Sequence, residues 1–199
     1  MRSMVPVRCH GSHCCGIPAQ HGGFDRILAH MKSFQRIVSF DAKHWDGSML
    51  PYYMAKAAWL RWQFFGERFR TLENWLRICY LVSDDCYSYL MCPDGTVRIK
   101  SGGQPSGRFT TLSDNSLIGE LLFIASFLLL AGSDGDSSSD DYYYNEYISK
   151  TCALNMGDDL MFADNTDWSE NDWINAYNEF NIEMKPAEGV EFLSHDVDE

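Results

Sequence analysis

A chain of 199 residues, 45% of them apolar and 22% charged, can bury one sizeable core, which is typical of a single globular domain and argues against a disordered tail. The formal net charge of -12 argues against a chain that grips a nucleic-acid backbone alone, because such binding depends on Lys and Arg displacing phosphate counterions. Either the partner is not a nucleic acid, or the basic parts of the protein lie elsewhere. Seven cysteines without regular spacing indicate free thiols in a reducing compartment rather than a disulfide framework.

The first 35 residues are predicted to form an irregular N-terminal segment, with one short helix at residues 24–31. Its start has no apolar core before a cleavage site, so a secretory signal is not predicted. The segment contains a group of soft metal ligands: Cys9, His10, His13, Cys14 and Cys15. They lack the paired CxxC spacing of structural zinc sites, so free thiols are favoured and a zinc site stays an alternative.

A strand and two helices are predicted next. Residues 36–40 are β-prone and lead directly to Asp41, so a buried strand delivers this carboxylate at its end. Pro51 can open a helix, and apolar residues at three- and four-residue spacing predict helices at residues 52–65 and 68–81.

The turn sequence Pro93-Asp94-Gly95 predicts a hairpin, with strands at residues 87–92 and 96–100. A glycine-rich stretch at residues 101–107 follows. The pattern after it predicts one long helix over residues 111–130.

Two neighbouring stretches stand out by composition. Residues 117–131 form the most apolar run, which contains Glu120 and is shorter than the roughly twenty residues needed to span a bilayer, so a buried helix and no transmembrane segment are predicted. Residues 132–147 carry five acids and no Lys or Arg, which indicates an acidic surface insertion. A surface loop without chemistry is the favoured interpretation of that insertion.

The last third of the chain predicts a second hairpin, a helix and a strand. Apolar residues 152–156 and 160–163 flank Gly157-Asp158-Asp159, which places acids at the hairpin tip. Helical character returns at residues 168–180, and residues 190–195 are expected to begin another strand. The whole order predicts an α+β fold in which helices pack on one face of an antiparallel sheet.

Two acidic groups, Asp41 and the pair Asp158-Asp159, are far apart in the sequence, and each lies at the end of an apolar strand. If the two strands are neighbours, their carboxylates converge, and such hard oxygens suit Mg²⁺, which takes one or two carboxylates plus substrate phosphates. Two metal ions held this way can activate an attacking oxygen and stabilise a leaving oxygen. The pattern therefore predicts phosphoryl or nucleotidyl transfer.

The residues also resemble a family. Asp41 with Asp46, then SGxxxTxxxN over residues 106–115, then Gly157-Asp158-Asp159 resemble in order motifs A, B and C of the RNA-dependent RNA polymerases of positive-strand RNA viruses. The strings DGSM and GQPSGRFTTLSDNS are most similar to the astrovirus, potyvirus and picornavirus side of that family, and residues 192–195 are similar to its motif E. Each motif alone is weak, since Gly-Asp-Asp is an ordinary turn sequence, so the combination carries the resemblance.

The resemblance implies a polymerase palm, here one palm domain fragment over residues 1–199, and template-directed nucleotidyl transfer from ribonucleoside triphosphates. It implies that three catalytic acids hold two Mg²⁺ ions, or Mn²⁺ in their place: Asp41, Asp158 and Asp159. It also implies substrate-binding roles for five residues: Asp46, Ser106, Gly107, Thr111 and Asn115. Among these, Asp46 and Asn115, oriented by Thr111, would sense the ribose 2′-hydroxyl, which distinguishes RNA from DNA precursors.

Some of these residues have simpler interpretations. Asp159 could cap the hairpin turn, Asn115 could bond its own helix backbone, and Ser106-Gly107 could form a plain turn before a helix. Lys185 is a candidate for the motif D proton donor to the leaving pyrophosphate, with a solvated surface charge as the alternative.

A working polymerase of this family also needs basic fingers before motif A and a thumb after motif E, and the chain has room for neither. Their place elsewhere in a parent polyprotein would explain the negative charge of the palm. The implied partners are an RNA template, a primer or product strand and ribonucleoside triphosphates, in a replication complex in the host cell cytoplasm. Two alternatives stay open: a reverse transcriptase-like palm, and a non-enzymatic acidic interaction module.

Overall fold

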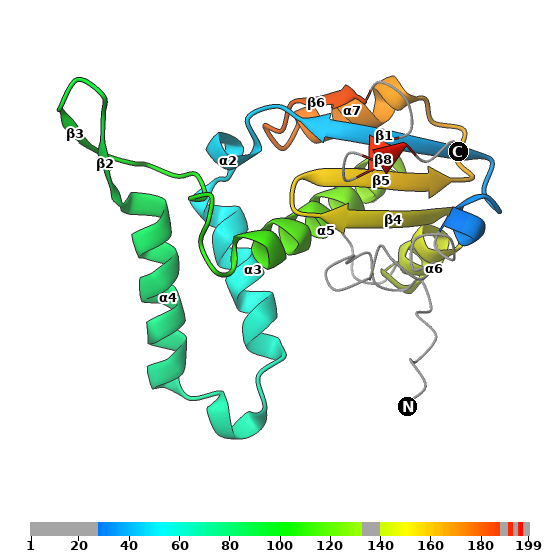
Figure 1. Ribbon diagram of the computed structural model, residues 1–199. Helices are drawn as coiled ribbons and strands as arrows, with labels where there is room; N and C mark the ends of the chain where they lie inside the picture. The colour runs from blue at the N-terminus through cyan, green and yellow to red at the C-terminus, as the bar shows by residue number, and fades with distance from the viewer. Residues whose placement is uncertain (1–27, 133–139, 188–190, 193–194, 197–199) are drawn as a thin grey trace, which may run out of the picture.

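The computed structural model describes residues 28–132, 140–187, 191–192 and 195–196 (Figure 1). The Cys/His group of the N-terminal segment lies outside the described residues, as does the first half of the helix predicted at residues 24–31. Residues 28–31 are helical. The four described cysteines, Cys79, Cys86, Cys92 and Cys152, form no disulfide bond among the described residues.

A four-stranded antiparallel sheet forms the centre of the molecule, in the order β4-β5-β1-β6 (Figure 1). Its strands are β1 (Arg36–Ala42), β4 (Thr151–Met156), β5 (Asp159–Asp164) and β6 (Met184–Pro186). The predicted hairpin is thus β4-β5, and its turn consists of two residues, with Asp159 already in β5.

The two faces of the sheet carry different side chains, because successive residues of a strand point to opposite sides. Phe40 and Phe162 point to the face covered by helices α5 (Thr111–Leu130) and α7 (Glu170–Asn178). There the rings of Phe123 and Trp173 stack with centroids 5.0 Å apart. The fold predicted from the sequence, an antiparallel sheet with helices packed on one face, is confirmed.

Met161 and Ala163 point to the opposite face, where they pack in a smaller cluster with Met31. By the same alternation, Asp159 of β5 points to this second face. The strand residues Asp41 and Asp159 are therefore separated from the helical layer by the sheet itself.

Helix α5 occupies the predicted range, and by length and composition it could cross a membrane. Half of its apolar window is buried inside the chain, and Ile118, Phe123 and Phe127 are fully buried. Packing against the sheet and α7 accounts for the apolar character of this helix.

The segment between β1 and α5 projects from the sheet as an arm (Figure 1). The arm, so named here, consists of α2 (Trp45–Ser48), α3 (Pro51–Gln63), the 3₁₀ turn η1 (Glu67–Phe69), α4 (Leu72–Tyr87), and the hairpin of β2 (Tyr89–Met91) and β3 (Val97–Ile99). The predicted hairpin is confirmed. The second helix spans Leu72–Tyr87, whereas residues 68–81 were predicted, so it both begins and ends later than expected. It begins at residue 72 because the Thr71 side chain accepts a hydrogen bond from the Asn74 N–H and caps the helix there.

Two other predictions were wrong in part. The second half of the acidic stretch is not a loop, because residues 140–150 form helix α6 (Asp140–Lys150). Its Tyr147 ring packs against Phe127 at 5.5 Å, and a Glu146–Lys150 ion pair spans one helical turn. In place of one strand at residues 190–195, β7 (Glu191–Phe192) pairs with β8 (His195–Asp196), and the sequence patterns did not reveal β6.

Candidate active site

The register of the sheet brings the predicted acids to the same end of two neighbouring strands. Phe40 of β1 pairs with Leu160 of β5 in an antiparallel ladder, so the next residue of β1, Asp41, lies across from Asp159. Asp158 occupies the turn between β4 and β5. Residues separated in the sequence by more than a hundred positions therefore form one acidic strand end.

The three carboxylates affect one another electrostatically. The pKa of Asp159 is raised above its usual value, first by burial and then by the negative charges of Asp158 and Asp41. Such repulsion arises where like charges lie close together in partly buried surroundings. It is typical of a site built to receive a cation.

Asp41 already has a cationic neighbour. It is the register partner of Lys185 in the β1-β6 ladder, and the Lys185 Nζ lies 2.7 Å from the Asp41 Oδ2. Because β6 was not predicted from the sequence, this contact was not expected. The structure thus places Lys185 directly beside a predicted metal ligand.

Within the described residues, no group of three or more His, Cys, Asp or Glu side chains is arranged as a finished metal cage. The donor set nevertheless fits Mg²⁺ or Mn²⁺, because carboxylate oxygens are hard ligands and Mg²⁺ usually needs only one or two of them beside water and phosphate oxygens.

A pocket of about 720 Å³ lies beside the acids. Six predicted site residues line it: Asp46, Ser106, Gly107, Thr111, Asn115 and Asp158. Three others do not line it: Asp41, whose neighbour Ala42 does, Asp159 and Lys185. The pocket therefore brings the motif B residues together with Asp46 from the motif A segment.

Hydrogen bonds hold the pocket wall in place. The Ser106 hydroxyl donates to the Asp46 carboxylate, and the Gln104 N–H donates to the Asp46 carbonyl at 2.9 Å. The Thr111 hydroxyl donates to the Pro105 carbonyl at 2.9 Å. In contrast, the Oδ1 of Asn115 is buried and accepts no hydrogen bond from the described residues. A buried amide oxygen without a partner is costly, so this atom is suited to a ligand hydroxyl.

Two glycines allow close approaches that shape the site. Gly103 has a φ of +82°, and a Cβ added to it would lie 3.0 Å from the Asp46 carbonyl oxygen. Gly157 has a φ of +70° in the hairpin turn, and its N–H donates to the Ser116 hydroxyl of α5 at 2.9 Å. These contacts hold α2 against the glycine-rich stretch and the acidic turn against α5.

Sequence reasoning did not single out Arg108. It lines the pocket and forms ion pairs with Asp84, at 2.8 Å, and Asp85 of α4. Burial raises the pKa of Asp85 and the Arg108 guanidinium opposes that effect. The available signal was a cation directly after Ser106-Gly107, but its acidic partners could not be read from local patterns.

Comparisons with known proteins agree with this geometry. The family model described as viral RNA-dependent RNA polymerase matches residues 7–197. The non-structural polyprotein 1AB of Human astrovirus-1 is 27% identical over 128 residues, covering 61% of this chain and 9% of the polyprotein. The genome polyprotein of Pea seed-borne mosaic virus is 28% identical over 157 residues, covering 78% of this chain and 4% of the polyprotein.

The fold is similar to that of the Sicinivirus 3Dpol RNA-dependent RNA polymerase, with a TM-score of 0.67 at 15% identity over 93% of this chain. The chain spans 36% of that polymerase and less than a tenth of the two polyproteins. The family match, which covers nearly all residues, agrees with the motif order in the sequence. The chain therefore belongs to the viral RNA-dependent RNA polymerase family.

Proposed function

We propose that the chain is the catalytic palm of an RNA-directed RNA polymerase, which joins ribonucleotides by template-directed nucleotidyl transfer. The primer 3′-hydroxyl would attack the α-phosphate of a ribonucleoside triphosphate and release pyrophosphate. The observation that carries the proposal is the β1-β5 register, which gathers Asp41, Asp158 and Asp159 beside the pocket.

Polymerases of this family use divalent metal ions, and we propose that Asp41 and Asp158 hold two Mg²⁺ ions, with Asp159 in support. When bound, such ions activate the attacking oxygen and neutralise the leaving one. Mn²⁺ has the same preference for carboxylate oxygens and is a substitute. Burial, and after it the charges of Asp158 and Asp41, raise the pKa of Asp159, and this supports the assignment because a bound divalent cation would offset both effects.

Ribose selection is assigned to Asp46 and Asn115, which both line the pocket. The Asp46 carboxylate accepts from Ser106 and the Asn115 Oδ1 is without a described partner, so both can accept from a 2′-hydroxyl. Thr111 would orient them through the start of α5, and Ser106 with Gly107 would contact the template and incoming nucleotide. A 2′-deoxy precursor would leave these acceptors unsatisfied.

Lys185 is proposed as the proton donor to the leaving pyrophosphate. The support for this role is its place at the acidic strand end, with Nζ 2.7 Å from Asp41 Oδ2. A general acid must lie within hydrogen-bond reach of the group that it protonates. The structure brings Lys185 within hydrogen-bond reach of Asp41, a proposed metal ligand.

The remaining parts of the proposal concern the parent protein. We propose that fingers and thumb outside this chain supply the cations that grip template and product RNA, since the chain itself is strongly acidic. The isolated fragment would then be inactive or nearly so. The reaction would take place in a replication complex in the cytoplasm of the host cell.

The proposal is tested in the parent polymerase with Asp158→Ala and Asp46→Ala. Asp158→Ala should reduce RNA synthesis by at least about 10³-fold, because it removes a metal ligand from the reacting centre. Asp46→Ala should retain synthesis and lose discrimination between ribonucleotides and 2′-deoxyribonucleotides. Both are measured by primer extension with each class of triphosphate.

A matched control is Asp94→Ala, which removes an acid from the other hairpin turn, in the arm. It should leave both synthesis and ribose discrimination near their original values. Full activity of Asp158→Ala would refute the metal site. That result would favour the acidic interaction module, whereas unchanged ribose discrimination in Asp46→Ala would leave the reverse transcriptase-like palm as an alternative.

A further inference from the structure

We infer that Lys185 is the counter-ion of the metal-free site, which holds the carboxylate of Asp41 until a divalent cation replaces it. The inference rests on the proposed function, because it takes Asp41 to be a metal ligand. It gives Lys185 a positioning role before the reaction, separate from proton donation. The observation behind it is the ion pair between Lys185 Nζ and Asp41 Oδ2 at 2.7 Å.

The backbone itself sets this contact. Asp41 and Lys185 are register partners in the β1-β6 ladder, so their side chains leave the sheet on the same face. Two residues further on, the Lys43 N–H donates to the Glu183 carbonyl at 2.9 Å, and the side chains of Lys43 and Glu183 also form an ion pair. Two pairs of opposite polarity thus follow one another along the ladder.

The need for a counter-ion follows from the charge balance. Asp41, Asp158 and Asp159 lie at one end of two strands and repel one another, and partial burial of Asp159 strengthens that repulsion. The ammonium group of Lys185 neutralises Asp41 on the side away from Asp159, because β6 and β5 flank β1 on opposite sides. The acidic strand end can therefore fold without a metal ion.

A divalent cation competes with this pair. The Lys185 ammonium occupies Oδ2, one of the two carboxylate oxygens that Asp41 can offer to a metal. Its positive charge also repels any cation placed between Asp41 and Asp158. The side chains of Lys185 and Asp41 are 51% and 49% exposed, so water screens the pair and lets it break when a stronger charge arrives.

The test uses the whole 199-residue chain and Mn²⁺ alone as the probe. Lys185→Gln removes the charge and keeps much of the side-chain volume. We expect it to bind Mn²⁺ about fivefold more tightly, because the repulsion and the competition for Oδ2 are gone. Binding is measured from the electron paramagnetic resonance signal of free Mn²⁺.

In the absence of metal, the same variant should be less stable, with a Tm lower by about 1–3 °C, because the acids lose their counter-ion. Tighter metal binding together with lower metal-free stability distinguishes a counter-ion from a residue that only supports the fold. A supporting residue would weaken metal binding when it is removed.

Two variants serve as controls. Lys185→Arg keeps the positive charge and should bind Mn²⁺ with nearly the original affinity. Lys43→Gln breaks the neighbouring, also exposed ion pair of Lys43 with Glu183. It should lower Tm by about as much as Lys185→Gln while leaving the Mn²⁺ affinity nearly unchanged. The comparison separates the charge at Asp41 from the general effect of one fewer cation on this ladder.

The outcomes separate the two proposals. If Asp158→Asn weakens Mn²⁺ binding but Lys185→Gln binds Mn²⁺ no more tightly than the unchanged chain, the counter-ion inference is wrong and the metal site stands. If Asp158→Asn binds Mn²⁺ as tightly as the unchanged chain, the proposed metal site is wrong. If neither the unchanged chain nor Lys185→Gln binds Mn²⁺, both proposals are wrong.

Discussion

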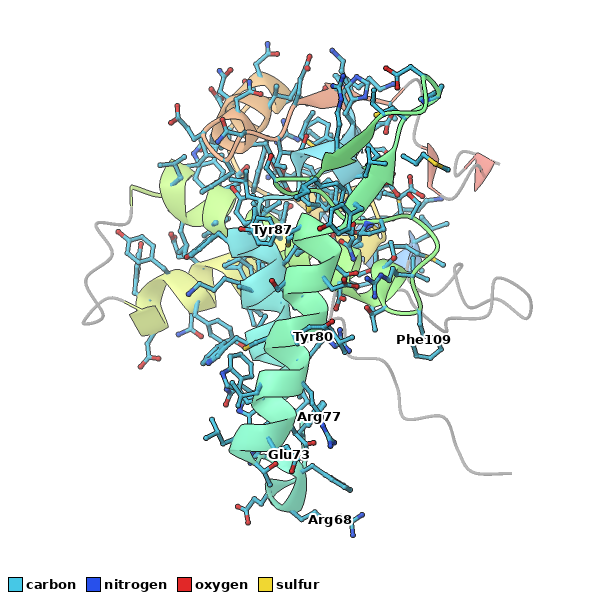
Figure 2. All side chains as sticks on the ribbon, turned by 90° about the vertical axis from the view of Figure 1, so that its left-hand side faces the viewer. Arg68, Glu73, Arg77, Tyr80, Tyr87 and Phe109 are labelled. Atoms are coloured by element: carbon cyan, nitrogen blue, oxygen red, sulfur yellow. The ribbon has the colours of Figure 1, made fainter. Side chains whose placement is uncertain are left out.

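The sheet and the arm differ in what covers their apolar side chains. Around the sheet, the rings of Phe123, Phe162 and Trp173 are fully buried against one another. In the arm, Trp59 and Tyr80 are 50% and 72% exposed, and Figure 2 shows Tyr80 on the outer face of α4. Both regions are rich in aromatic residues, but Trp45 is the one aromatic side chain of the arm that is buried within the described chain.

The arm is joined to the rest of the molecule partly by packing and partly by charge. Met54 and Ala57 of α3 belong to the main core, whereas α4 contributes Cys86 from its last turn. Ion pairs add further links: Arg61 of α3 with Asp114 of α5, and Arg108 with Asp84 and Asp85 of α4. Stability is therefore concentrated in the sheet and its helices, while polar contacts orient the arm beside the pocket.

The largest expected effect tests where the stability lies. Trp173→Ala removes a fully buried ring and should lower the free energy of unfolding by about 3–5 kcal/mol. Trp59→Ala, at a half-exposed position of the arm, should lower it by less than about 1 kcal/mol. Urea denaturation followed by circular dichroism measures both, and equal losses would contradict the division into a stable sheet and a weaker arm.

An intermediate effect tests the polar links. The Arg61 guanidinium donates to both oxygens of the buried Asp114 carboxylate, at 2.8 and 3.0 Å. Arg61→Ala would leave this charge without its partner, so we expect the free energy of unfolding to fall by about 1–2 kcal/mol. The loss is smaller than for a fully buried ion pair because Arg61 is partly exposed.

Hydrogen exchange should then show reduced protection in α3 and at the start of α5. The control is Arg77→Ala, which breaks an exposed pair with Glu73 within α4 (Figure 2) and should cost less than about 0.5 kcal/mol. Equal losses in the two variants would mean that the link to α5 contributes no more than a surface pair.

The smallest effect tests the acidic strand end without metal. The folded-state pKa of Asp159 is raised above its ordinary value of 3.8, chiefly by burial. The carboxyl therefore costs stability above the raised pKa, where it is charged, and this cost disappears as the pH falls below 3.8. Asp159→Asn should raise Tm at pH 7 by about 1–3 °C, with a difference that vanishes in acid.

Thermal unfolding of both chains across the pH range measures this effect, in buffers that contain a chelator. A Tm difference of the same size at pH 7 and in acid would show that it arises from packing rather than from the charge of Asp159. The arm differs here, because its neighbouring acids Asp84 and Asp85 are already paired with Arg108.

Much of the local structure followed from the sequence. Residues 111–130 form α5 as predicted, because a long apolar run that follows a polar start is a strong local signal for a buried helix. The strand before Asp41 and the hairpin around Asp158 also formed where alternation and turn residues placed them. The prediction of a surface loop at residues 132–147 was wrong for its second half. The acidic composition indicated a solvent-exposed segment, whereas Tyr147 packs against Phe127 in the core.

The main helices and strands, the motif order and the candidate acids could be read from the amino-acid sequence, because these features depend on neighbouring residues. The strand order, the addition of β6 and the pairing of Lys185 with Asp41 could not, and they became visible only in the folded chain. The same holds for the contact of Arg108 with the acids of α4. Strand pairing and ion pairs join residues that are remote in the chain, so the free energy that selects them depends on packing of the whole molecule rather than on any local pattern.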